Sequence, residues 1–94
     1  MSTQTVKVVS KANPRLSGEY ACDADAWVAI SAELYATQGA EPVCYEWADA
    51  DGKVRSMTPA EFRAFAKAVA KWRQADRKRA IGITASAPES VSLD

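Results

Sequence analysis

Two short acidic stretches hold the residues whose types and spacing come closest to a reactive site. In "ACDADAW", Cys22 stands beside Asp23 and near Asp25, so a thiol and a carboxylate base are neighbours in sequence. A cysteine nucleophile needs a base and a third group that orients the base. The chain contains no histidine, and neither this stretch nor Ser31 with a distant lysine supplies the third group. We therefore predict that the protein is not an enzyme.

The second stretch, "EWADADGK", places Asp49 and Asp51 before Gly52, which suggests a calcium loop. Such a loop runs for about 12 residues and closes with a bidentate glutamate, which is missing here. A hairpin turn accounts for the same residues, because Asp49 can accept bonds from the backbone ahead and Gly52 tolerates a positive φ. We predict neither a metal ion nor another cofactor. Cys22 and Cys44 are expected to be buried or half-buried thiols in a reducing cytoplasm, since two cysteines make no disulfide framework.

A basic stretch, "KWRQADRKR" at residues 71–79, is the candidate binding site. It is either a solvated helix end whose cations complement the helix dipole or a surface that contacts a partner. Arg73 and Arg77 are one helical turn apart and project together, and Trp and Arg are common interface anchors. The residues predicted to bind a partner are Trp72, Arg73, Arg77, Lys78, Arg79, Lys67 and Lys71.

Charge and composition narrow the class of partner. The chain has 12 basic and 12 acidic residues. Residues 1–57 carry 5 bases and 8 acids, a charge of −3, and residues 58–94 carry 7 bases and 4 acids, a charge of +3. The acidic half would repel a phosphate backbone and no nucleic-acid-binding motif is present, so we expect a protein partner rather than nucleic acid.

The length and composition predict one small globular domain without a membrane segment. The chain has 94 residues, of which 48% are hydrophobic and 26% charged, which suits a single core. No uncharged apolar run approaches the roughly 20 residues that span a bilayer, and "MSTQTVKVVSKANPRLSG" lacks the apolar segment of a secretory signal.

Apolar periodicity predicts a helix over residues 23–39. Asp23 or Asp25 caps its beginning, and Gly39 ends it in a left-handed conformation. Its buried side is expected to contain Trp27, Ile30 and Leu34, which recur at helical spacing.

A hairpin and a second helix follow. Val43, Tyr45 and Trp47 alternate with Cys44 and Glu46 and are expected to present one apolar face. In the return strand, Val54 is the apolar residue that alternates with Lys53 and Arg55. Thr58, Pro59 and Glu61 form a complete helix-start signal, flanked by a hydrophobic staple of Met57 and Phe62. The stripe predicted to be buried is Phe62, Phe65, Ala66, Val69 and either Ala70 or Trp72, and the residues predicted to face outward are Arg63, Lys67, Lys71 and Lys78.

These elements predict a small α+β domain over residues 18–83. Its order is a helix, a two-stranded antiparallel hairpin and a long helix, with room for one extra short edge strand such as "TVKVVS". We expect residues 1–17 to be a flexible N-terminal arm, because "KANPR" interrupts that strand, and residues 84–94 to be a disordered tail.

The order of these features resembles a domain of unknown function found in bacteriophage tail-fibre and tail-assembly proteins. The resemblance spans about residues 18–76 and rests on the strand that ends at Trp47, the Asp51–Gly52 turn, the start of the second helix at Thr58 and the run from Ala66 to Ala75. It implies a phage or prophage origin, a location in the host bacterial cytoplasm or the virion, and two helices packed on a hairpin. It supplies no catalytic residue.

Together, these points predict non-catalytic protein binding. The first hypothesis is a phage accessory protein, related to tail-associated domains, that acts in the virion or its assembly. The alternative is an early phage protein that binds and inhibits a host factor, such as a defence complex or a regulator. The partner is then a tail component, a host protein or a second copy of the chain.

Overall fold

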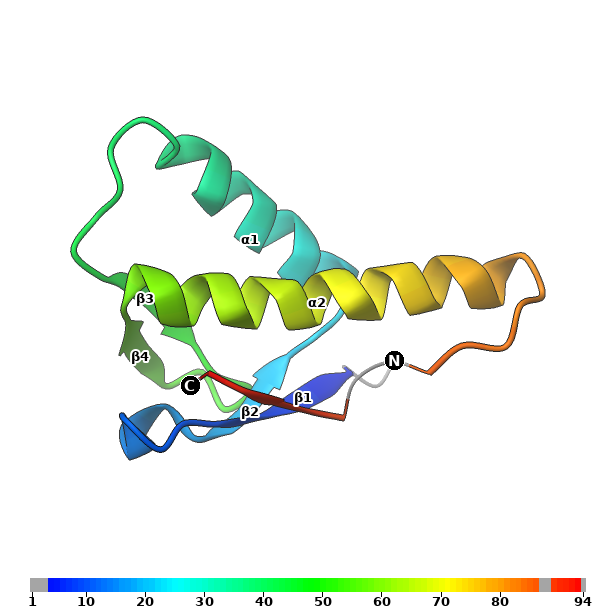
Figure 1. The fold of residues 1–94 in the computed structure, drawn as a ribbon, viewed down its shortest axis with the longest axis horizontal. Helices are drawn as coiled ribbons and strands as arrows, with labels where there is room; N and C mark the ends of the chain where they lie inside the picture. The colour runs from blue at the N-terminus through cyan, green and yellow to red at the C-terminus, as the bar shows by residue number, and fades with distance from the viewer. Residues whose placement is uncertain (1–3, 87–88, 94) are drawn as a thin grey trace.

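The computed structural model describes residues 4–86 and 89–93, which form an α+β domain of two α-helices, one short 3-10 helix and two sheets (Figure 1). This confirms the predicted fold class. The elements are β1 (Thr5–Val9), the 3-10 helix η1 (Pro14–Leu16), β2 (Gly18–Ala21), α1 (Ala24–Ala36), β3 (Tyr45–Ala48), β4 (Val54–Met57), α2 (Pro59–Ala80) and β5 (Ser90–Ser92). In the described part of the chain, no helix is both long and apolar enough to cross a membrane.

β1 is the central strand of a three-stranded sheet. It pairs antiparallel with β2 and parallel with β5. Val6 and Val8 alternate with exposed neighbours and are 0% exposed themselves. The flexible arm predicted for residues 1–17 is therefore wrong for the described residues 4–17, because strands on both sides of β1 satisfy its backbone groups. Residues 1–3 of that arm lie outside the described residues.

The C-terminal segment returns to the same sheet, where a disordered tail was predicted for residues 84–94. The N–H of Leu93 donates to the Val9 carbonyl over 3.0 Å, and Leu93 is buried. Two parallel strands need a long connection between them. The local sequence of β5 therefore does not indicate that it pairs with β1. Residues 87, 88 and 94 lie outside the described part of the tail.

Helix α1 begins as predicted and ends earlier. The Asp23 carboxylate accepts a hydrogen bond from the Ala26 N–H over 2.9 Å, so Asp23 rather than Asp25 is the cap. The helix stops at Ala36, and the Thr37 hydroxyl donates to the Glu33 carbonyl. The predicted left-handed ending at Gly39 is wrong, because this glycine has no positive φ.

The β3–β4 hairpin has the predicted turn but a different apolar face. Gly52 has a φ of +85°. In the strand register, Tyr45 lies opposite Met57 and Trp47 opposite Arg55, so these pairs share the inner face. Val54 is displaced to the outer face and is 60% exposed, while Val43 precedes the strand and is 92% exposed.

Helix α2 confirms its predicted start and its predicted two sides. The Thr58 hydroxyl accepts from the Glu61 N–H, and the Glu61 carboxylate accepts from the Thr58 N–H over 2.8 Å. The buried residues are Phe62, Phe65, Ala68, Val69, Trp72 and Ala75; Ala66 and Ala70 are half-buried, and Arg63, Lys67, Lys71 and Lys78 are exposed. Figure 1 shows α2 running between α1 and the three-stranded sheet, with its C-terminal turns projecting beyond both.

Aromatic contacts join α2 to both sheets. The Phe62 ring stacks on Tyr45 with centroids 4.2 Å apart, and Phe65 meets Tyr20 at 5.3 Å. The core therefore lies under the first four turns of α2, from Phe62 to Trp72, and the last two turns contribute little to it.

Candidate partner-binding surfaces on helix α2

Trp72 belongs to the core rather than to the surface. Its side chain is 7% exposed, and its indole N–H donates a hydrogen bond to the Gln4 side chain. A buried, hydrogen-bonded tryptophan stabilises the fold and is not available to a partner. The prediction of Trp72 as an interface anchor is therefore wrong, because the stripe that starts at Phe62 extends to it.

The Arg73 side chain contacts α1. Its guanidinium lies 5.0 Å from the centroid of the half-buried Trp27 ring, a cation–π distance. Arg77 is one turn further along and is exposed. The two arginines thus lie on one side of α2 as predicted, but Arg73 already has an aromatic partner.

The projecting end of α2 is exposed on every side. Residues 76–80 are all exposed, and Ile81, directly after the helix, is 75% exposed. Arg79 forms an ion pair with Asp76 over 3.7 Å and donates to the Ala85 carbonyl. We name this surface the basic end and define it as Arg77, Lys78, Arg79 and Ile81.

A second basic surface lies along another flank of α2. Lys67, Lys71 and Lys78 recur at helical spacing and line two adjoining hollows, with Lys71 common to both. The larger hollow, about 470 Å³, is lined by Lys71, Gln74, Ala75, Lys78, Ile83, Thr84, Ala85 and Ser86. The smaller, about 210 Å³, is lined by Ala64, Lys67, Ala68, Lys71, Ser90, Val91 and Ser92. We name this surface the lysine groove.

The seven predicted residues therefore do not form one surface. Trp72 is buried, Arg73 packs on α1, and the rest divide between the basic end and the lysine groove, which share Lys78. The basic residues were found from sequence because lysine and arginine are exposed wherever they fall on a helix. The opposite wall of the groove was missed, because residues 83–86 and 90–92 reach α2 only through the tertiary fold.

The outer face of α1 is a surface that the sequence reasoning missed. Val28 is 64% and Tyr35 80% exposed, and Ala29, Ala32 and Ala36 beside them are also exposed. A helix on a protein surface normally has one apolar stripe and one polar side. The signal was present, since only Asp25 and Glu33 are charged in the 13 residues of α1.

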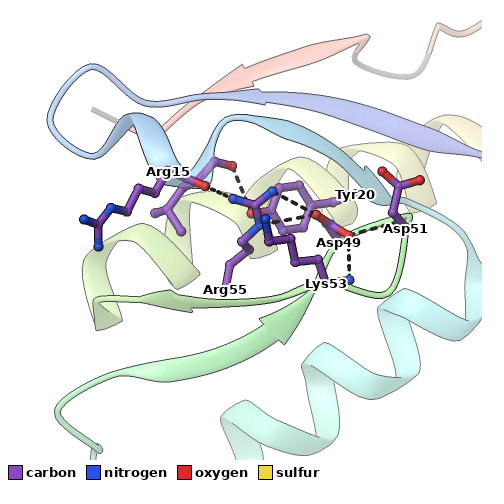
Figure 2. A network of polar contacts seen from close by, with 7 residues as sticks. Arg15, Tyr20, Asp49, Asp51, Lys53 and Arg55 are labelled. Carbon is purple, nitrogen blue, oxygen red and sulfur yellow. Dashed lines mark hydrogen bonds and ion pairs between the residues drawn. The ribbon is translucent and has the colours of Figure 1, made fainter.

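The acidic stretch at the hairpin turn, which contains Asp49 and Asp51, stabilises the fold (Figure 2). Two nitrogens of the Arg55 guanidinium donate to Asp49, with Nη2 3.2 Å and Nε 3.3 Å from Oδ2. The other carboxylate oxygen, Oδ1, accepts from the backbone N–H groups of Asp51 and Lys53. The Lys53 backbone N–H and the Arg55 side chain hold the pKa of Asp49 below its usual value. Among residues 4–86 and 89–93 there is no group of three or more acidic, cysteine or histidine side chains placed to hold a metal ion.

The two cysteines differ in environment, and both are free thiols. Cys22 is buried, and burial together with the charge of Asp23 raises the pKa of its thiol to about 11. A thiol with such a pKa is a poor nucleophile at neutral pH. Cys44 is exposed, which contradicts the prediction of two buried or half-buried thiols.

The chain was compared with known protein families. Residues 4–91 match the model of a family described as a domain of unknown function (DUF4376). The match includes β1 and reaches β5, so it is longer than the resemblance over residues 18–76. No curated protein and no solved structure matches the chain.

Proposed function

We propose that this chain, which belongs to the DUF4376 family of domains of unknown function, is a non-catalytic domain that binds a protein partner through the basic end of α2. The observation that supports this is the projection of that end beyond the body of the domain (Figure 1), with Arg77 and Lys78 exposed. A projecting helix end can enter a concave surface on a partner without rearrangement of the fold.

The composition of the basic end fits a protein surface. Arginine is enriched at interfaces, and Ile81 adds an apolar contact next to the charges. Asp76 is the one acid of this region within the described residues, and it pairs with Arg79. Within the described part of the chain, Arg77 and Lys78 take part in no ion pair. Their charges would steer an acidic partner surface toward the helix end.

The biological setting that we propose is a phage or prophage accessory protein that acts in the virion or its assembly. It rests on the resemblance of residues 18–76 to a domain of phage tail proteins. The partner would then be a tail component. If the partner is instead a host protein, the alternative function is favoured, in which an early phage protein inhibits a host factor.

Affinity capture with a matched pair of variants tests this function. The tagged wild-type protein, captured after cross-linking in phage-producing bacterial cells, is expected to recover one partner in constant proportion. Arg77→Gln with Ile81→Ser should lose that partner and remain folded, because exposed substitutions usually change the free energy of unfolding by about 0.5 kcal/mol or less.

The control is Lys53→Gln with Val54→Ser, which removes one exposed cation and one exposed β-branched side chain from the hairpin. This variant should capture the partner as the wild type does. Equal capture by the Arg77–Ile81 variant and the wild type would contradict a role for the basic end.

A further inference from the structure

The lysine groove follows a flank of α2 and shares Lys78 with the basic end. We propose that it binds an extended, acidic peptide segment. This inference rests on the proposed function, because it assumes a protein partner. It specifies the charge and the conformation of the peptide segment through which that partner would bind.

The spacing of the lysines fits an extended chain. Along the helix axis, Lys71 lies about 6 Å from Lys67, and Lys78 about 10 Å further, at 1.5 Å per residue. In an extended peptide, side chains on the same side are about 7 Å apart. Acidic residues at alternate positions would therefore meet Lys67 and Lys71 in turn, and the long, flexible stem of Lys78 can reach a third.

The shape of the groove admits a peptide backbone. On the α2 side, small residues stand between the lysines: Ala68 and Ala75 are buried and Ala64 is half-buried. The opposite side consists of residues 83–86 and of β5, an edge strand of its sheet. Hydroxyl side chains there, Thr84 and Ser90 among them, can donate to carbonyl or carboxylate oxygens.

The charge of the groove is uncompensated. No acidic residue lines either hollow, and within the described residues Lys67, Lys71 and Lys78 take part in no ion pair. By contrast, Arg63 on the same helix pairs with Glu41. Three unpaired cations along one line produce a positive potential that attracts an anionic chain.

A peptide fits these observations better than a nucleic acid. Single-stranded nucleic acids bind where aromatic side chains stack on their bases. Among the described residues that line the groove, none is aromatic. Trp72, the aromatic residue nearest to these lysines in sequence, is buried. The −3 charge of residues 1–57 would also oppose a long polyanion, whereas a short acidic segment need not extend beyond α2.

Binding of a defined peptide tests the proposal. The probe is a fluorescein-labelled peptide of the sequence Gly-Asp-Val-Glu-Val-Asp-Gly, whose acids alternate, measured by fluorescence anisotropy at low and physiological salt. The wild-type protein should bind it in a salt-dependent manner. Lys67→Gln with Lys71→Gln should weaken binding by about tenfold, since the variant loses two exposed ion pairs to the peptide.

Three comparisons make the result decisive. Lys7→Gln with Lys53→Gln, which removes the same charge from exposed positions of β1 and the hairpin, should bind like the wild type. A peptide with its acids in one block should bind more weakly than the alternating one. The proposal would be overturned if the wild type did not bind the peptide, or if the groove variant bound it as well as the wild type does. Tighter binding of a single-stranded oligonucleotide of equal charge would also overturn it.

The outcome is distinguishable from that of the proposed function. The capture experiment uses Arg77 and Ile81, which do not line the groove. If the peptide fails to bind and the Arg77–Ile81 variant still loses the captured partner, the groove proposal fails and the protein-binding function stands.

Discussion

Arg55 and Asp49 form an ion pair across the turn of the hairpin, with Nη2 and Oδ2 3.2 Å apart and side chains only 23% and 6% exposed. The same guanidinium donates to the carbonyl of Arg15, so the pair joins β4 to η1 (Figure 2). The Ala50 N–H donates to the Glu19 carbonyl over 2.9 Å, which ties the turn to β2. The turn that suggested a calcium loop therefore connects the hairpin to η1 through Arg55 and to β2 through the Ala50 backbone.

Asp49→Asn should destabilise the protein in a pH-dependent manner. The pKa of Asp49 is lowered in the folded state, first by the hydrogen bond from the Lys53 N–H, so its contribution is present above the unfolded pKa of about 3.8 and is lost as the pH falls through the folded value. The difference in Tm between the wild type and the variant should thus be largest at neutral pH and shrink below about pH 4. Thermal unfolding followed by circular dichroism checks this.

The control for this experiment is Asp51→Asn in the same turn. Asp51 contributes its backbone N–H to the network, and its side chain is exposed. Its variant should therefore lose little stability at any pH. An Asp49→Asn variant whose Tm difference is independent of pH would show that the carboxylate charge is not what stabilises the turn.

Shortening the buried valines of β1 should destabilise the whole domain. Val6→Ala and Val8→Ala each remove two buried methyl groups and leave a cavity, at a cost of about 2 kcal/mol apiece. Thr5→Ala with Lys7→Ala, on the exposed side of the same strand, should cost much less. Urea unfolding measures both, and a Val6–Val8 double variant as stable as the wild type would mean that β1 is a loosely attached arm after all.

The parts of the fold that could be predicted from sequence are those with local causes. The Thr58–Glu61 capping box and the stripe from Phe62 to Trp72 involve residues within a few turns of one helix. The position of β1 could not be predicted, because Val8 lies opposite Val91, and no local pattern encodes a partner so distant in sequence. Pairing of strands far apart in sequence depends on the whole core.

The hairpin shows how one register decides which side chains face the core. The turn at Gly52 was predicted, yet the apolar face was assigned to Val54 because valine is the apolar residue between two cations. The observed register puts Arg55 inward, where Asp49 and the Arg15 carbonyl compensate its charge. The candidate site changed for a similar reason: the lysines were visible in the sequence, but the groove that they line with β5 requires the tertiary fold.

The thiols of Cys22 and Cys44 should react at different rates. Cys44 is exposed and should react readily with a disulfide reagent such as Ellman's reagent at neutral pH. Cys22 should stay protected in the folded protein, because it is buried and its pKa is raised to about 11. Thiol titration of the wild type and of Cys44→Ser, with and without denaturant, checks this. Rapid modification of folded Cys44→Ser would contradict the burial of Cys22.

Arg73→Gln should destabilise the protein, whereas Arg77→Gln should not. Arg73 lies over the Trp27 ring at 5.0 Å, a contact between α1 and α2 worth about 0.5–1 kcal/mol at an exposed site. Arg77 projects from the same side one turn later and is exposed, so its variant should change the free energy of unfolding by about 0.5 kcal/mol or less.

Urea unfolding of the two single variants, together with Trp27→Leu and the Trp27–Arg73 double variant, completes a double-mutant cycle that isolates the pair. A coupling energy near zero would mean that the guanidinium merely lies near the ring. A favourable coupling would show that Arg73 helps to hold α1 against α2. Substitution of Arg73 would then weaken partner binding through the fold, and for that reason Arg77 is the sounder residue with which to test the basic end.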